Sequence, residues 1–338
     1  MSRRVVLYIG NHLGDNGRYP SVAQILAPHL RENIHFHLVS GKRNPFLRLV
    51  HIVYAVLRYA GRQQPVMIDT YSTAAFNYAL LTATLCRLLS WNYICVLHGG
   101  SLPNRLAQFP GLCKWVFGGA TQLVAPSAYL HNAFSKYGYA TTIIPNPIEM
   151  EKYAFKLRTQ VRPFLLWVRA FDATYNPAMA IEVVAGLKQK YPEVRLCMVG
   201  PDKDGSLQVC KELAKQRGVQ DRIRFAGILS KPEWIALSAH YDIFINTTHI
   251  DNTPVSVLEA MALGFPVVST NVGGMPYLIH SEENGILVQQ ASAEEMIAAI
   301  DRLCNNDSLA TLLSNNARNY VRKYEMNAVV QLWKRLLC

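Results

Sequence analysis

The residues best suited to chemistry lie between positions 251 and 274. Thr253 followed by Pro254 predicts a helix that begins at Pro254 with Thr253 as its cap, because Pro suits a first helical position. The N–H groups of the first turn, near Val255 and Ser256, would then have no partner inside the helix. Such groups bind phosphate, aided by the helix dipole. The segment therefore predicts a phosphate site at this helix start.

Glu259 is expected one to two turns further along the same helix. A carboxylate there can accept two hydrogen bonds from the vicinal hydroxyls of a ribose. Gly264 and Pro266 are expected to end the helix before a strand at Pro266–Ser269. The alternative is an ordinary strand–loop–helix segment in which Glu259 is a solvated surface residue.

The whole segment resembles the donor-nucleotide motif of the retaining GT-B glycosyltransferases of family 4, also called group 1. That motif has two acidic residues separated by seven others, and Asp251 and Glu259 take those positions, with Asp251 standing where the family usually has Glu. The resemblance implies that Glu259 anchors the ribose and that Asp251 is a catalytic residue that orients the donor sugar. The other matching residues are Leu258, Ala260, Met261, Gly264, Pro266, Val267, Val268, Gly273 and Gly274.

Two further positions gain a role through the resemblance. Arg169 follows the apolar segment Phe164–Val168 and matches the family's Arg that reaches the donor diphosphate. The family's preceding Gly is Val168 here, and its Lys a few residues later is absent. His98, which precedes two glycines, matches the histidine near the donor sugar and the breaking bond. The alternatives are a structural salt bridge for Arg169 and an ordinary hydrogen-bonded residue at a strand end for His98.

Two glycine-containing turns complete the implied site. Gly227 matches the turn against which the nucleotide base commonly packs. The loop 10–17 corresponds to the family's first loop by its position in the chain, although its residue types match less well. Its candidates for contacts with the acceptor or a phosphate are Gly10, Asn11, Asp15 and Asn16.

Parallel strands are needed to position these residues, and the sequence predicts two sets of them. Short apolar segments alternate with helical ones, which is typical of parallel sheets covered on both faces. In such sheets the ligand lies beyond the carboxyl ends of the strands. The expected strands are Arg4–Ile9, Ile34–Val39, Val66–Asp69, Tyr93–His98, Gln122–Ala125, Phe164–Val168, Arg195–Val199, Ile223–Phe225, Asp242–Ile245 and Pro266–Ser269.

The predicted fold is α/β, with two doubly wound domains. The resemblance makes this a GT-B fold, in which two Rossmann-like domains face each other and a C-terminal helix crosses back to the first. The expected bounds are 1–145 for the basic acceptor-binding domain, 146–163 for a linker, 164–317 for the nucleotide-sugar domain and 318–338 for the helix.

The net charge of +11 lies entirely in the first half of the chain. Residues 1–160 contain 16 Lys and Arg against 5 Asp and Glu, whereas residues 161–338 contain 18 of each. No acidic side chain lies between Asp69 and Glu149. The first half is therefore expected to face an anionic partner: nucleic acid, anionic lipid or a phosphorylated substrate.

A helix after Pro45 adds a cationic stripe to this half. Arg48, Arg58 and Arg62 fall within one arc of the helix beside apolar and aromatic residues, which suits an anionic membrane surface. The alternative is a core helix with a solvated Arg face. No nucleic-acid-binding motif is recognisable, so a membrane surface and a lipid-linked or oligosaccharide acceptor are the expected partners.

The sequence thus predicts a retaining glycosyltransferase that moves a sugar from a UDP- or GDP-linked donor to a glycan acceptor, such as a lipid-linked saccharide in cell-surface polysaccharide or glycolipid synthesis. No prosthetic group and no metal are expected, because the family needs no metal and no cluster of metal ligands is visible. The seven cysteines include no CxxC pair, so buried, reduced thiols are expected.

The expected location is cytoplasmic and peripheral at the inner face of the membrane, since no apolar stretch reaches the roughly 20 residues of a bilayer span. Three alternatives stay open. They are a sugar-nucleotide epimerase or phosphorylase on the same fold, a non-catalytic membrane-associated protein with a degraded donor site, and a basic nucleic-acid binder.

Overall fold

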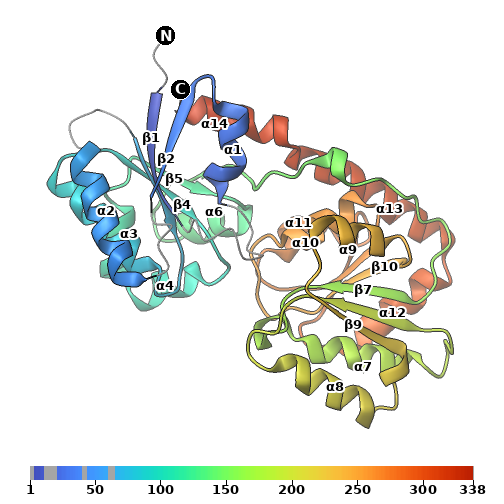
Figure 1. The fold of residues 1–338 in the computed structure, drawn as a ribbon. Coiled ribbons are helices and arrows are strands. Elements are labelled where there is room, and N and C mark those ends of the chain that lie inside the picture. The colour runs from blue at the N-terminus through green and yellow to red at the C-terminus, as the bar shows by residue number, and fades with distance from the viewer. Residues whose placement is uncertain (1–3, 11–20, 40–43, 60–64, 338) are drawn as a thin grey trace. The chain divides into compact units, whose positions relative to one another are not determined.

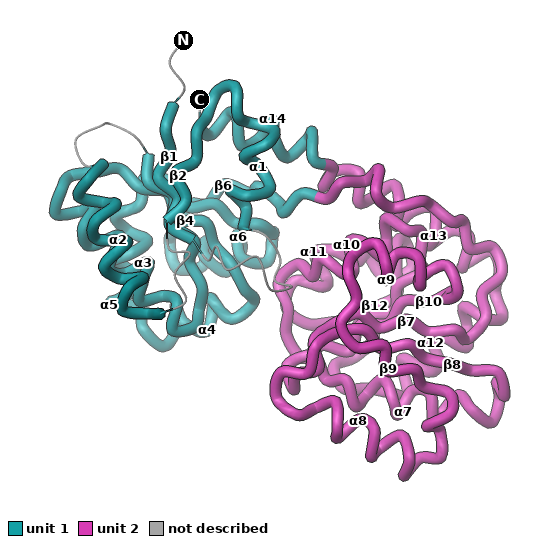
Figure 2. Tube along the Cα trace, in the orientation of Figure 1, with its two compact units in different colours: residues 1–147, 326–338 teal, residues 148–325 magenta. Residues whose placement is uncertain are grey.

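The computed structural model describes residues 4–10, 21–39, 44–59 and 65–337. The chain divides into two compact units (Figure 2). Unit 1 contains residues 1–147 and 326–338, and unit 2 contains residues 148–325. Each unit is built on one six-stranded sheet whose paired strands are all parallel (Figure 1).

The sheet of unit 1 has the strand order β2-β1-β3-β4-β5-β6. Its strands are β1 (Arg4–Ile9), β2 (Ile34–Val39), β3 (Val66–Thr70), β4 (Tyr93–Leu97), β5 (Gln122–Ala125) and β6 (Thr142–Ile143). Its helices are α1 (Val22–Leu30), α2 (Pro45–Tyr59), α3 (Phe76–Leu88), α4 (Leu102–Gln108), α5 (Pro110–Phe117), α6 (Ala128–Ser135) and α14 (Met326–Leu337).

Both faces of this sheet are buried, because successive side chains of a strand point to opposite faces. Leu7 and Ile9 of β1 pack in the core that includes residues of α2, α3 and α5. Val6 and Tyr8 pack on the other face, with residues of α1 and α14. The continuous apolar runs of the strands follow from this double burial.

The sheet of unit 2 has the order β12-β11-β10-β7-β8-β9. Its strands are β7 (Phe164–Val168), β8 (Arg195–Val199), β9 (Ile223–Gly227), β10 (Ile243–Asn246), β11 (Val267–Thr270) and β12 (Ile286–Val288). Its helices are α7 (Pro177–Leu187), α8 (Ser206–Gln216), α9 (Lys231–Ser238), α10 (Val255–Ala262), α11 (Met275–Leu278), α12 (Ala293–Cys304) and α13 (Asp307–Val321). Two separate buried clusters again cover the two faces of the sheet.

The helical region at the end of the chain is divided. Helix α13 ends at Val321, a 3-10 turn spans Arg322–Tyr324, and α14 begins at Met326. Glu325 between them has an extended backbone, with φ −59° and ψ 142°, and it pairs with Ile148. A single helix from residue 318 onward is therefore not formed, because extended backbone at Glu325 interrupts the helical hydrogen bonds.

Candidate active site

Arg169 and Asp251 form an ion pair in unit 2. Arg169 directly follows β7, and its N–H donates to the carbonyl of Val199 at 2.9 Å. Its guanidinium lies over the ring of Tyr175, 4.6 Å from the ring centroid. Burial lowers the pKa of Arg169 to about 10, so the group remains a cation at neutral pH. The structure thus brings together two of the predicted catalytic residues.

The loop that carries Asp251 is fixed by the glycine pair after β11. The N–H of Gly274 donates to the carbonyl of Asp251 at 2.8 Å. A Cβ on Gly273 would lie 2.2 Å from the Asp251 carbonyl oxygen, and one on Gly274 would lie 1.6 Å from the Asn252 carbonyl oxygen. These positions exclude any side chain, since the loop backbone passes directly against them.

The start of α10 differs from the prediction by one residue. Pro254 itself is the N-cap, the helix begins at Val255, and no side chain caps it, so the prediction of Thr253 as the cap is wrong. The carbonyl of Pro254 accepts from the N–H groups of Val257 and Leu258, because Pro254 adopts the extended backbone of a cap residue.

The first turn of α10 keeps unused hydrogen-bonding groups. Within the described part of the chain, the N–H groups of Val255 and Ser256 have no hydrogen-bond partner. The hydroxyl oxygen of Ser256 is also buried and unpartnered there. Free amides at a helix N-terminus beside a buried hydroxyl can hold an oxyanion such as phosphate.

Glu259 is a buried residue of α10 with only 4% of its surface exposed, so it is not a solvated surface carboxylate. Its Oε1 accepts a hydrogen bond from the hydroxyl of Tyr153 at 2.7 Å. The ammonium of Lys231, at the start of α9, lies 2.7 Å from the same oxygen. Both contacts are made by Oε1, which leaves Oε2 as the oxygen with capacity for a ligand hydroxyl.

Gly227 ends β9 in the left-handed region, with φ +68°, and a Cβ there would meet no atom within 4 Å. Its carbonyl accepts from the N–H of Gly200 at 2.8 Å. Gly200 follows β8 and approaches Arg169 so closely that a Cβ would lie 1.7 Å from the Arg169 carbonyl oxygen. The carboxyl ends of β7, β8 and β9 are thereby held together around Arg169.

His98 lies at the carboxyl end of β4 in unit 1, where 15% of its side chain is exposed. Its Nε2 is 2.7 Å from Oδ1 of Asp69, and its ring stacks on Tyr71 with 4.8 Å between centroids. Asp69 ends one expected strand, and no site role is predicted for it from the sequence. The next expected strand ends at His98, and the shared edge of strand ends in a parallel sheet is the signal that could have identified the pair.

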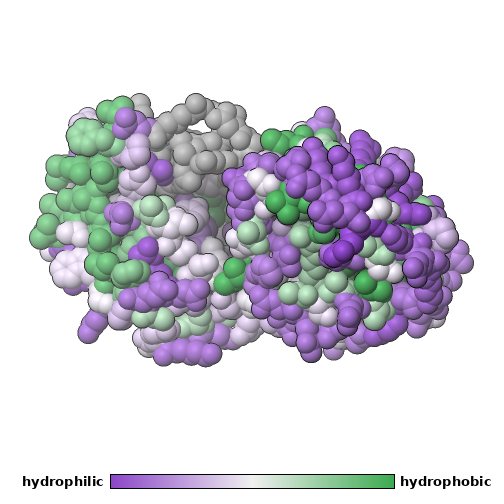
Figure 3. All heavy atoms as spheres, turned by 90° about the horizontal axis from the view of Figure 1, so that it is seen from below, coloured by the Kyte–Doolittle hydropathy of each residue, from purple (hydrophilic) through white to green (hydrophobic). Residues whose placement is uncertain are grey.

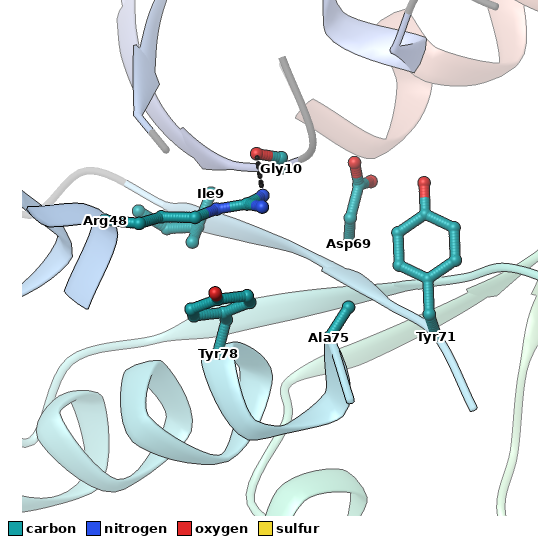
Figure 4. Close-up of a pocket in the computed structure, with 7 residues that line it drawn as sticks. All are labelled: Ile9, Gly10, Arg48, Asp69, Tyr71, Ala75 and Tyr78. Carbon is teal, nitrogen blue, oxygen red and sulfur yellow. Dashed lines mark hydrogen bonds between the residues drawn. The ribbon is translucent and has the colours of Figure 1, made fainter. Parts of the chain in front are cut away.

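Arg48 does not lie on the outer face of α2. It is buried, and its Nη2 donates to the carbonyl of Gly10 at 3.2 Å while the guanidinium lies over the ring of Tyr78 (Figure 4). With Asp69 and Tyr71 it lines a small pocket. The expectation that Arg48 faces a membrane is therefore wrong, since the side chain points into the unit.

The remaining predicted positions divide into two groups. Arg58 is exposed on α2, and Gly10 is buried at the end of β1. The other four residues lie outside the described residues: Asn11, Asp15, Asn16 and Arg62.

Two kinds of feature are absent from the described residues. No group of three or more His, Cys, Asp and Glu side chains there could hold a metal ion. None of the helices described is long and apolar enough to cross a bilayer.

Residues 149–320, just over half of the chain, match the family model of glycosyl transferases group 1. The chain belongs to this family. The matched segment coincides with nearly all of unit 2, so the family's motif and the geometry at Arg169, Asp251 and Glu259 fall in the same part of the chain.

Two curated relatives of the chain are also glycosyltransferases by name. An uncharacterized glycosyltransferase of Haemophilus influenzae is 31% identical over 155 residues, which cover 45% of this chain and 42% of that protein. A lipopolysaccharide core biosynthesis glycosyltransferase of Rhizobium meliloti is 30% identical over 158 residues, covering 46% and 44%. The chain thus spans less than half the length of these relatives.

The fold is similar to that of a solved member of the same architecture. HepE of Anabaena, crystallised in complex with UDP, superposes with a TM-score of 0.79 over 99% of each chain at 16% identity. This likeness confirms the predicted GT-B fold class.

Proposed function

We propose that the protein is a retaining, metal-independent glycosyltransferase that uses a UDP- or GDP-linked sugar. The observation that carries the proposal is the cluster at the strand ends of unit 2. There the ion pair of Arg169 and Asp251 joins the end of β7 to the loop before α10. Helix α10 carries the free amides and the buried carboxylate of Glu259. A nucleoside diphosphate presents two phosphates and a ribose diol, which match a cation, helix amides and a carboxylate.

Each group has a separate role in the proposed transfer. Arg169 and the amides of Val255 and Ser256 stabilise the negative charge that develops on the departing diphosphate. Oε2 of Glu259 accepts hydrogen bonds from the ribose hydroxyls. Asp251 orients the donor sugar. We assign His98, in unit 1, a separate contact with a bound sugar. The exposed side chain of Ile228, next to Gly227, offers an apolar surface for the nucleotide base.

The acceptor in this proposal is a glycan carried on a lipid, at the inner face of the cytoplasmic membrane. The support comes from unit 1, where apolar side chains gather over α2 and its neighbours, at the left of Figure 3. We name this surface the apolar helix face. It consists of exposed residues on α2, at the end of α3 and on or beside α5: Phe46, Leu47, Val50, Tyr54, Leu57, Leu88, Leu89, Phe109, Leu112 and Trp115.

Contiguous apolar surface of this kind marks interaction sites on soluble proteins. The exposed cations on the same helices, Arg58, Arg87 and Lys114, fit an anionic lipid surface. Cell-surface glycolipid synthesis is consistent with the lipopolysaccharide core enzyme among the relatives.

The deciding experiment is a thermal-shift panel with UDP, GDP, ADP and CMP, each at about 1 mM. A ligand present at 100 times its Kd stabilises a protein by about 2.7 kcal/mol, which a melting curve resolves. We expect one uridine or guanosine nucleotide to raise the melting temperature.

The matched variants are Glu259→Gln and Asp242→Asn. Both neutralise a buried, ion-paired carboxylate of unit 2, but Asp242 precedes β10, at the opposite end of the strand from the cluster. We expect the nucleotide response to disappear in Glu259→Gln and to persist in Asp242→Asn. A wild-type protein that responds to none of the four nucleotides contradicts the proposal.

A further inference from the structure

Neighbouring strands of unit 1 bring Asp69 and His98 together. The register of β3 and β4 pairs Thr70 with Leu97, and the N–H of His98 donates to the carbonyl of Thr70 at 2.9 Å. Asp69 is thus the last but one residue of β3, and His98 is the first residue after β4. Their side chains meet with 2.7 Å between Nε2 of His98 and Oδ1 of Asp69.

The partners of Oδ1 determine which ring nitrogen of His98 carries the proton. The hydroxyl of Tyr8 donates to the same oxygen at 2.5 Å, so Oδ1 already acts as an acceptor. A carboxylate only accepts hydrogen bonds, and the imidazole nitrogen facing it must therefore be N–H. In the neutral ring, Nδ1 of His98 is then the nitrogen with a free lone pair.

Tyr71 fixes the plane of the same ring. It stacks on His98 with an interplanar angle of 18°, and its hydroxyl points in the same direction as the Asp69 carboxylate (Figure 4). Burial, followed by the nearby charge of Asp69, raises the pKa of Tyr71, so its hydroxyl keeps its proton. The orientation of the His98 ring is thus set by one in-plane bond and one stacked neighbour.

The buried carboxylate of Asp69 lowers the stability of the fold. Asp69 is 6% exposed, and its Oδ2 is buried without a partner among the described residues. A Cβ on Gly10 would lie 2.4 Å from that oxygen, so the end of β1 has room for it only because residue 10 is Gly. A buried, half-satisfied carboxylate is destabilising, and such groups are typical of functional sites.

We propose that Asp69 is a positioning residue: it holds His98 with the proton on Nε2 and so presents Nδ1 as the hydrogen-bond acceptor for a hydroxyl group of a bound sugar. The kinetic part of this inference rests on the proposed function. The protonation part does not, because it is a property of the protein alone.

Long-range ¹H–¹⁵N spectra of ¹⁵N-histidine-labelled protein measure which ring nitrogen is protonated, and a His98→Asn variant assigns the signals. In the wild-type protein with a neutral His98 ring, we expect the Nε2–H form. In Asp69→Ala we expect a mixture of both forms. Asp69→Asn keeps an acceptor oxygen that two donors orient, and should retain the Nε2–H form.

The control is Asp242→Ala, which removes an equally buried carboxylate from unit 2 and should leave the His98 spectrum unchanged. If the protein transfers a sugar in the assay, kcat of Asp69→Ala should fall at least about tenfold, which corresponds to the loss of one ordinary hydrogen bond. The Kd of the nucleotide should stay unchanged. Asp69→Asn should recover part of kcat.

A wild-type His98 with its proton on Nδ1 overturns the proposal. So does an Asp69→Ala variant with the wild-type spectrum and the wild-type kcat. Should Asp69→Ala fail to fold, the wild-type and Asp69→Asn spectra still decide the protonation. A protein with Nε2–H but no transferase activity would reject the proposed function and leave the positioning role standing.

Discussion

The guanidinium of Arg169 is ion-paired with the carboxylate of Asp251, although the two residues follow different strands of unit 2. Arg169 is thus held in place by a neighbouring anion. A diphosphate would bring its own negative charge to the same cation. We therefore expect Asp251 to oppose diphosphate binding electrostatically, while in the proposed function it contributes a hydrogen-bond acceptor for the sugar.

From this pair we predict that Asp251→Asn separates nucleotide affinity from turnover. UDP or GDP, whichever binds, should bind at least as tightly as to the wild-type protein, because Arg169 loses a competing anion. The value of kcat/KM should fall by roughly thirtyfold, from the loss of about 2 kcal/mol in a charged hydrogen bond. Isothermal titration and initial rates measure the two quantities.

Arg169→Gln is the complementary variant, and should weaken both nucleotide binding and turnover. An Asp251→Asn protein that loses nucleotide affinity to the same extent as Arg169→Gln would show that the aspartate supports the diphosphate site instead of opposing it.

Tyr153→Phe should lower both the free energy of unfolding and the affinity for nucleotide. The change removes the hydrogen bond from the Tyr153 hydroxyl to the buried carboxylate of Glu259 without altering the ring. A hydrogen bond to a charged group contributes about 1.5–3 kcal/mol to the free energy of unfolding. Urea denaturation should show a loss of that order, and nucleotide affinity should decrease severalfold.

The control for this prediction is Tyr191→Phe, which removes a 2.7 Å hydrogen bond to Asp301. Tyr191 precedes β8, at the end of that strand opposite to the candidate site. Tyr191→Phe should leave nucleotide affinity unchanged. Equal affinities in the two variants would remove Tyr153 from the donor site.

The apolar helix face should mediate binding to anionic vesicles. Phe46 and Tyr54 lie two turns apart on α2 and are 70% and 65% exposed. The double variant Phe46→Ser/Tyr54→Ser should lose about 2–4 kcal/mol of binding free energy, if each ring buries most of its surface in the lipid. Sedimentation with vesicles containing anionic lipid measures the partition coefficient.

The matched control replaces two exposed apolar residues of unit 2, Val209→Ser and Leu312→Ser, which are 58% and 47% exposed. This control should bind vesicles like the wild-type protein. Raising the salt concentration should weaken wild-type binding, because the contribution of Arg58 and its neighbours is screened. Equal binding of both double variants would place the contact elsewhere.

The buried cysteines should resist alkylation in the folded protein. Burial raises the pKa of Cys86, Cys95 and Cys210 to about 12. At pH 8 the thiolate fraction is then on the order of one in ten thousand, and the thiolate is the reactive form. Peptide mass spectrometry after iodoacetamide treatment should find these residues unmodified, and modified once the protein is unfolded in urea. Rapid labelling of Cys95 in folded protein would contradict the burial of β4.

The strands of the fold could be predicted from the sequence because both faces of each sheet are buried. Continuous apolar runs such as Arg4–Ile9 and Phe164–Val168 begin and end where the structure has β1 and β7. Strands β6 and β12 were missed. β6 has only two residues, both exposed, and β12 has three, so neither run is long enough to be distinguished from a loop.

Site residues could be predicted from the sequence where they lie close together along the chain. They could not be predicted where their partners are far away along the chain. Glu259 and Asp251 lie within one loop and helix, so their spacing was visible. Tyr153 lies 106 residues from Glu259, and Lys231 belongs to another helix, so only the folded chain brings them together. The inward direction of Arg48 had the same cause, since its partner Gly10 lies 38 residues away.

The return of α14 to unit 1 also limits when unit 1 can complete its core. Val330 and Trp333 complete a core that contains Val6 and Tyr8, and Nη1 of Arg4 donates to the carbonyl of Leu337 at 2.5 Å. Unit 1 therefore stays incomplete during synthesis until α14 (Met326–Leu337) has been made, whereas unit 2 already has all its strands by then. Closing so long a loop is slow, and the apolar residues that α14 covers stay exposed to chaperones or to wrong partners in the meantime.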